Sequence, residues 1–75
     1  MKRYEIYIED ITPCGGPKYA RKEFLEAEAE SPEEYVKRNG RHPVIDCTVL
    51  PGGDVSIRTG DGRGYYVNYV FTELN

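Results

Sequence analysis

Alternation of apolar and polar residues is the feature that most constrains the fold of this 75-residue chain. Side chains repeat every two residues on one face of a β-strand. In residues 64–74, GYYVNYVFTEL, the two sets of alternate side chains are Tyr65, Val67, Tyr69 and Phe71, and Tyr66, Asn68, Val70 and Thr72. The same alternation predicts strands over residues 3–11, 44–50 and 54–59, and Ile45, Cys47 and Val49 should share one face. Glycine and proline residues next to these segments are expected to end the strands.

The segment 19–29 combines the composition of a helix with the periodicity of a strand. Alanine, lysine, glutamate and leucine favour helices, but Leu25, Ala27 and Ala29 alternate with glutamates. Pro32 also disfavours helical backbone at Ser31. We therefore predict a strand here, and a helix over 19–29 remains the alternative.

A short helix is predicted over residues 32–39. Ser31 is suited to the N-cap, Pro32 to the first helical position, and Glu34 to the third, which completes a capping box. Gly40 is expected to end the helix in the left-handed conformation. Eight residues cannot form a stable isolated helix, so this one must pack against the sheet.

These elements follow the order β-β-α-β-β-β and predict a single small α+β domain over residues 1–75. The short turns at 51–54 and 60–64 favour an antiparallel arrangement of the last three strands. We expect one antiparallel sheet of about five strands, with one short helix on one face. A chain of this size buries only roughly 60% of its unfolded surface, and dimerisation commonly stabilises such domains.

Charge and cysteine content limit the partners and the cellular compartment that are expected for this chain. Ten basic and 13 acidic residues give a net charge of −3, too balanced to indicate a nucleic-acid or membrane partner. No apolar stretch approaches the ~20 residues of a membrane span, and the N-terminal MKRYEIYIED does not resemble a signal peptide. Cys14 and Cys47 lie far apart, without metal-site or disulfide-framework spacing. We expect a cytoplasmic protein of bacterial or phage origin with reduced thiols.

Two glycine-rich segments were considered as chemical sites. TPCGGPK (12–18) contains Cys14 and Lys18, but nothing in the sequence places His42 or a helix start beside the thiol, as an activated cysteine requires. The lysine spacing also differs from that of a phosphate-binding loop. Gly60–Gly64 precedes a strand rather than a helix, unlike a dinucleotide fingerprint. Both segments are predicted to be turns between strands.

Two charged clusters have structural explanations. Arg38, Arg41 and His42 surround the end of the predicted helix, where cations are favourable. Charged rows such as Glu26, Glu28 and Glu30 are typical of solvated strand faces, which they protect from incorrect pairing. A cation on the neighbouring strand, such as Lys2 or Arg3, is expected to offset this acidic row.

The remaining candidates lie on the sheet face opposite the helix or in the turn at 60–64 beside it. Tyrosine and arginine are enriched where proteins bind one another, and the predicted contact residues are Tyr66, Arg58, Arg63, Tyr7 and Phe24. We predict a non-enzymatic protein-interaction module that binds a protein partner or a second copy, through the open sheet face or an edge strand. The alternative is single-stranded nucleic-acid binding by base stacking, which the negative net charge disfavours. No catalytic residue, cofactor, metal or small-molecule substrate is predicted.

Overall fold

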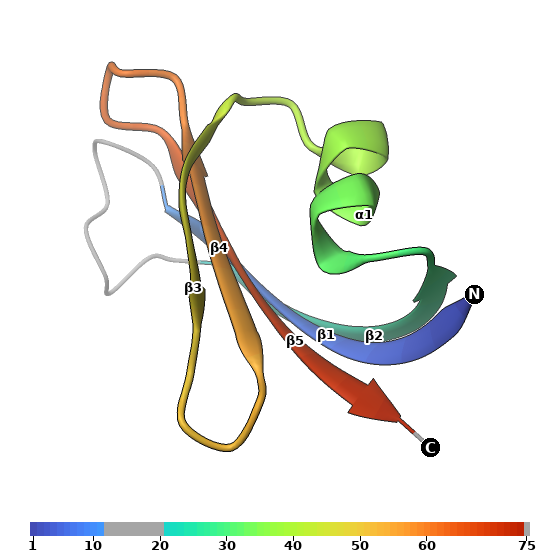
Figure 1. Ribbon diagram of the computed structural model, residues 1–75. Helices are drawn as coiled ribbons and strands as arrows, with labels where there is room; N and C mark the ends of the chain where they lie inside the picture. The colour runs from blue at the N-terminus through green and yellow to red at the C-terminus, as the bar shows by residue number, and fades with distance from the viewer. Residues whose placement is uncertain (12–20, 75) are drawn as a thin grey trace.

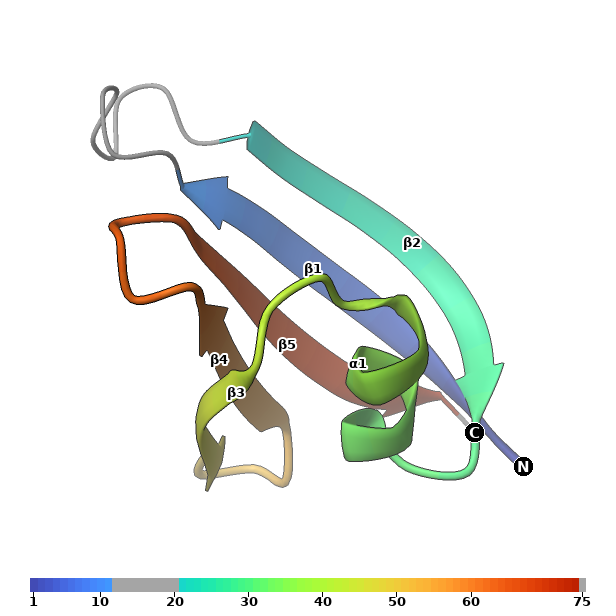
Figure 2. The ribbon, with the colours of Figure 1, turned by 90° about the horizontal axis from the view of Figure 1, so that it is seen from above.

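The described part of the chain forms one antiparallel sheet and one helix. The computed structural model describes residues 1–11 and 21–74. The strands run in the order β2-β1-β5-β4-β3 across the sheet, and the helix lies on one face (Figures 1 and 2). The elements are β1 (Lys2–Ile11), β2 (Arg21–Ala29), α1 (Pro32–Asn39), β3 (Val44–Val49), β4 (Val55–Gly60) and β5 (Tyr66–Leu74). The predicted α+β class and the order β-β-α-β-β-β are confirmed.

The structure decides between the two alternatives for the second segment. Residues 21–29 form a strand that pairs antiparallel with β1, from Lys2 opposite Ala29 to Asp10 opposite Arg21. The helix considered for this region is therefore wrong, and periodicity is a better guide here than composition. The turn predicted at 12–18, which contains Cys14 and Lys18, lies outside the described residues.

Helix α1 begins as its capping residues predict. The Ser31 side chain accepts a hydrogen bond from the Glu34 backbone N–H at 3.2 Å, which satisfies one of the free N–H groups of the first turn. Glu33 and Glu34 lie in that first turn, and Lys37 and Arg38 lie in the last. These charges complement the helix dipole at both ends. Among the described residues, no helix has the length and apolar character needed to cross a membrane.

The prediction that Gly40 adopts the left-handed conformation is wrong. Its backbone is extended, with φ −79° and ψ 148°, so its dihedral angles are open to any residue. Its N–H donates to the Val36 carbonyl oxygen at 2.7 Å and closes the last turn. A Cβ at this position would lie 2.6 Å from that oxygen. Glycine is therefore required here for its size and not for its conformational freedom.

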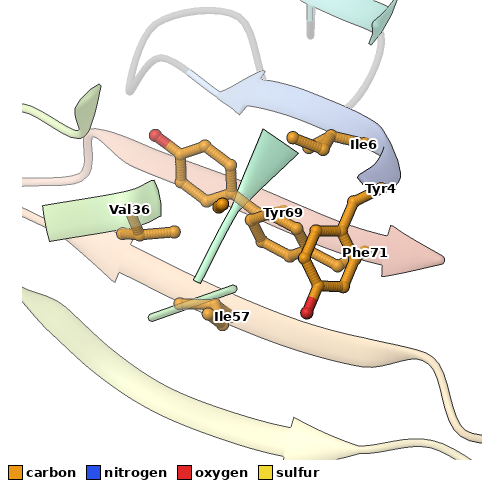
Figure 3. Packing of buried hydrophobic residues seen from close by; sticks show 7 residues of the cluster. Tyr4, Ile6, Val36, Ile57, Tyr69 and Phe71 are labelled. Atoms are coloured by element: carbon orange, nitrogen blue, oxygen red, sulfur yellow. The ribbon is translucent and has the colours of Figure 1, made fainter. Parts of the chain in front are cut away.

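The core lies between α1 and the sheet and is built around Phe71. This side chain is 1% exposed, and its ring makes edge contacts with Tyr4 and Tyr35 at centroid distances of 5.8 and 5.7 Å. Val36 is the buried residue of the helix. Figure 3 shows the side chains of Tyr4, Phe71 and Val36 gathered between the sheet and the helix. The buried hydrophobic residues are Tyr4, Ile6, Ala29, Val36, Ile57, Tyr69 and Phe71.

One side chain and one strand boundary depart from the predicted pattern. A bulge between Val44 and Asp46 shifts the register of β3 against β4 and turns Ile45 away from the face of Cys47. Strand β5 begins at Tyr66 rather than at residue 64, because Tyr65 belongs to the preceding turn. There the Asp61 carboxylate accepts the Tyr65 backbone N–H at 3.3 Å. Tyr65 therefore precedes the strand, although it still lines the same side of the sheet as Val67 and Tyr69.

Candidate functional site

The sheet face opposite α1 is called the open face. Residues of this face alternate with the core residues along each strand, since successive side chains point to opposite sides. No element among residues 1–11 and 21–74 covers it (Figure 1). The register of the strands arranges its side chains in rows that run across the sheet.

One row is apolar and is called the aromatic row. It consists of Phe24 on β2, Tyr7 on β1 and Val70 on β5, which are direct cross-strand neighbours. The rings of Tyr7 and Phe24 have a centroid distance of 4.8 Å. Phe24 is 68% exposed, so this packing does not remove its ring from water. A large exposed aromatic residue beside further apolar surface is typical of a binding site.

A second apolar row crosses four strands near one end of the sheet. Its members are Ile11 on β1, Tyr66 on β5, Gly60 on β4 and Ile45 at the bulge of β3. Tyr66 lies between Ile11 and Gly60 in the register of the strands. A Cβ at Gly60 would lie 2.7 Å from Ile45 Cδ1 and 2.9 Å from Tyr66 Cδ1. The absence of a side chain at Gly60 thus lets Ile45 and Tyr66 approach each other over its backbone.

A polar row separates the two apolar rows. Arg58 donates to the Asp46 carboxylate from Nε at 2.9 Å and from Nη2 at 2.6 Å. This ion pair raises the pKa of Arg58 and holds its guanidinium beside β3. Asn68, on β5, has a buried side-chain oxygen with no hydrogen-bond partner. The row consists of Lys22, Glu9, Asn68, Arg58 and Asp46.

The structure places four of the five predicted contact residues on the open face. Tyr7 and Phe24 are in contact, and Arg58 lies in the polar row between them and Tyr66. Arg63 is separate. It lies in the turn between β4 and β5, where its backbone N–H donates to Asp61 at 2.7 Å. That turn is the hairpin loop predicted for residues 60–64. The sequence interpretation placed Val70 on the face of Tyr66 but did not name it, Ile11 or Ile45 as contact residues.

The acidic row on β2 is partly neutralised, as predicted. Arg3 Nε lies 3.6 Å from Glu26 Oε1 on the open face. Lys2 instead pairs with Glu73 on β5, at 3.1 Å. Glu28 lies opposite Arg3 in the register, and Glu30 lies beyond the end of β2. Both partners of the Arg3–Glu26 pair are exposed, so the pair contributes little to stability.

A groove on the helix side of the sheet was not predicted. Its volume is about 620 Å³. The segment that follows α1 forms one wall, the turn before β5 forms another, and the sheet forms the floor. The residues that line it are Ile8, Asp10, Glu23, Asn39, Arg41, His42, Asp61, Tyr65, Val67 and Tyr69. Four separate segments supply them, and no sequence spacing connects the segments.

The groove contains charges of both signs. Arg41 and His42, which the sequence assigned to the helix end, face acidic residues from β1, β2 and the turn before β5. The pKa of Asp61 is lowered, chiefly because its carboxylate accepts the Arg63 N–H. Within residues 1–11 and 21–74, no three His, Cys, Asp or Glu side chains are grouped so that they could hold a metal ion.

Cys47 on β3 is a free thiol next to the first turn of α1. Its Sγ lies 4.0 Å from Glu33 Oε1. Although the residue is exposed, partial desolvation raises the pKa of its thiol, and the nearby carboxylates of Glu33 and Asp46 raise it further. Each effect disfavours the negatively charged thiolate, which is the reactive form.

Alkylation of Cys47 by iodoacetamide at pH 7.5 is expected to be slower than that of free cysteine. The fraction of thiolate falls when the pKa rises, so the rate should increase only at a more alkaline pH than for an ordinary thiol. Glu33→Gln should accelerate the reaction without restoring the free-cysteine rate, because the effect of burial remains. Peptide mass spectrometry of dilute protein between pH 7 and 10 measures the rate at Cys47. A rate equal to that of free cysteine would contradict the assigned environment.

Comparisons of the chain with protein-family models, with curated proteins and with solved structures found no match. The fold and the surface therefore define the class of protein only in architectural terms: a small α+β domain with one face of its antiparallel sheet open.

Proposed function

We propose that this chain is a cytoplasmic protein-interaction module that acts by binding rather than by catalysis, and that the open face is its main contact surface. The observation that carries the proposal is the aromatic row. Phe24 remains 68% exposed although it packs on Tyr7. Aromatic side chains at the centre of an interface contribute much of its binding energy, because burial removes their large apolar surface from water.

The charges around the aromatic row support a protein partner with basic residues at its rim. In the described strands the open face has five carboxylates and three cations, and two of the cations are already in ion pairs, with Glu26 and Asp46. The carboxylates are Glu5, Glu9, Glu26, Glu28 and Asp46, and the cations are Arg3, Lys22 and Arg58. A partner that presents apolar side chains bordered by lysine or arginine complements this surface.

The same charges argue against the nucleic-acid alternative. Phosphates are bound by unpaired basic groups, and most of the affinity for single strands depends on them. Tyr66 and Arg58 lie close together, as base stacking would require. However, the Arg58 guanidinium is already in an ion pair with the Asp46 carboxylate. We therefore keep nucleic-acid binding as an outcome of the test below.

Affinity purification of the tagged protein tests the proposal. Partners of the open face should be lost together when Phe24→Ala or Tyr7→Ala is used as bait. They should be retained with Tyr65→Ala, a matched control that removes an exposed aromatic residue outside the open face. With a purified partner, Phe24→Ala should weaken binding at least tenfold, or about 1.4 kcal/mol, as measured by calorimetry.

Two results would overturn the proposal. One is that no captured protein depends on Phe24 or Tyr7. The other is salt-dependent binding of a mixed-sequence oligonucleotide that is lost in Tyr66→Ala, which would support the nucleic-acid alternative instead.

A further inference from the structure

The outer edge of β3 has backbone groups that face away from the sheet. The Leu50 N–H donates to the Asp54 carbonyl at 2.7 Å, and this bond closes the β3–β4 hairpin. In an antiparallel pair, residues that hydrogen-bond to the neighbour alternate with residues whose N–H and C=O face the other way. Thr48 therefore bonds to β4, while Cys47 and Val49 direct their N–H and C=O groups outward. No other described strand pairs with this side of β3 (Figure 2).

The two edges of the sheet differ in charge. Strand β2 forms one edge and contains Lys22, Glu23, Glu26 and Glu28, and charged side chains of this kind discourage pairing with another strand. Strand β3 has one charged residue, Asp46, and Arg58 neutralises it. The apolar residues of β3 are exposed, with Val44 at 45%, Ile45 at 50% and Val49 at 69%. An uncharged, apolar edge with free backbone groups is suited to strand pairing.

We propose that β3 pairs with β3 of a second copy of this chain, antiparallel and about a two-fold axis through Thr48. The two sheets then form one continuous sheet of ten strands. In this register Cys47 of each copy lies opposite Val49 of the other. The outward N–H and C=O groups of both residues make four backbone hydrogen bonds across the axis. The inference goes beyond the function proposed above, because it concerns a different surface and names its occupant.

Self-complementarity of the strand argues for a second copy as the occupant. The register centred on Thr48 places the two Thr48 side chains opposite each other, and threonine pairs are favourable in this position. Asp46 lies opposite Leu50 of the other copy, so the two carboxylates do not face each other. An axis through Cys47 would pair Val49 with the bulged Ile45, and an axis through Val49 would pair Cys47 with Pro51, which has no N–H.

A two-fold axis of an antiparallel strand pair is perpendicular to the sheet. Both open faces therefore lie on the same side of the ten-stranded sheet, and the dimer presents two aromatic rows to one partner. Such a contact is isologous, so every pair of residues across it occurs twice.

A charge-swap experiment tests both the pairing and its register. Size-exclusion chromatography with light scattering should give the wild-type protein a mass of twice its chain mass of 8.6 kDa. This mass should hold over a roughly 100-fold range of protein concentration, from about 5 to about 500 µM. Thr48→Lys and Thr48→Glu should each be monomeric, because each places like charges opposite each other at the axis. An equimolar mixture of the two variants should restore the dimer. Thr48→Ser, the matched control, should remain dimeric.

Further measurements separate this inference from misfolding and from the proposed function. Thr48 is exposed, so circular dichroism should show both charged variants folded. Val49→Pro, which removes one outward N–H, should also be monomeric. Val49→Pro should still bind a partner of the open face, because Val49 lies opposite Val55 on the side of the sheet that faces α1, and Phe24→Ala should still dimerise. A monomeric wild-type protein, a dimeric Thr48→Lys variant or a mixture that stays monomeric would overturn the inference, whatever the result for Phe24.

Discussion

Replacing Phe71 by alanine is expected to remove about 3–5 kcal/mol from the free energy of unfolding, the usual cost of deleting a buried phenyl ring. The side chain is 1% exposed, and Tyr4, Tyr35 and Tyr69 all surround its ring. A domain of this size has a total stability of roughly 4–11 kcal/mol. The substitution should therefore remove a large share of the total stability, and a domain at the lower end of this range would be partly unfolded at 25 °C. Urea denaturation followed by circular dichroism, at a fixed protein concentration, measures the change.

Val70→Ala is the matched control for this prediction. Val70 is the next residue on β5 but lies half-buried on the open face. Its truncation should cost only about 1 kcal/mol, because it removes less apolar area from a less buried site. Equal effects of the two substitutions would show that the side of the sheet facing α1 is not the main core.

Gly40→Ala is expected to destabilise the protein by about 1–3 kcal/mol, as overpacking of a tight site does. The added Cβ would lie 2.6 Å from the Val36 carbonyl oxygen and 3.3 Å from Val36 Cγ1. The oxygen belongs to the backbone and accepts the hydrogen bond that closes α1. Relief of the clash must therefore disturb the last helical turn or the position of Val36 in the core. Thermal unfolding of the variant measures the loss.

Gly62 provides the comparison that separates size from conformation. Gly62 has φ +79° and open space around it, so Gly62→Ala strains only the backbone. Asparagine tolerates positive φ better than alanine, so Gly62→Asn should recover part of the loss. At Gly40 asparagine should be no better than alanine. Recovery by Gly40→Asn would contradict the steric explanation.

The elements that local signals define could be predicted from the sequence. Strand β1 follows from the alternation in residues 3–11, and α1 follows from Ser31, Pro32 and Glu34, whose interactions involve only near neighbours. For residues 21–29 periodicity and propensity disagree. The strand forms because two sets of tertiary contacts favour it. Strand β1 pairs with it along its whole length, and Leu25 and Ala27 pack against the core.

Features that depend on distant residues could not be predicted. Ile45 leaves the face of Cys47 because of a bulge, and the bulge depends on the alignment of β3 with β4 and on the space above Gly60. Tyr65 leaves β5 because Asp61 accepts its N–H. Gly40 marks the correct helix end for a reason that only the position of Val36 reveals.

The candidate surface shows the same division. Alternation placed Tyr7 and Tyr66 on the open face, and strand pairing then joined Tyr7 to Phe24 and added Val70 to the row. Arg63 lies in the turn that was predicted for residues 60–64, separate from the rows of the open face. The groove beside α1 left no signal in the sequence, since its residues come from four separate segments.

The charged character of β2 has a consequence for how far assembly can proceed. When two copies join through β3, this edge of each sheet is paired, and β2 forms both outer edges of the joined sheet. Lysine and glutamate side chains at these borders discourage the addition of a third copy. In the proposed dimer, association would therefore stop at two copies and would not continue into fibres.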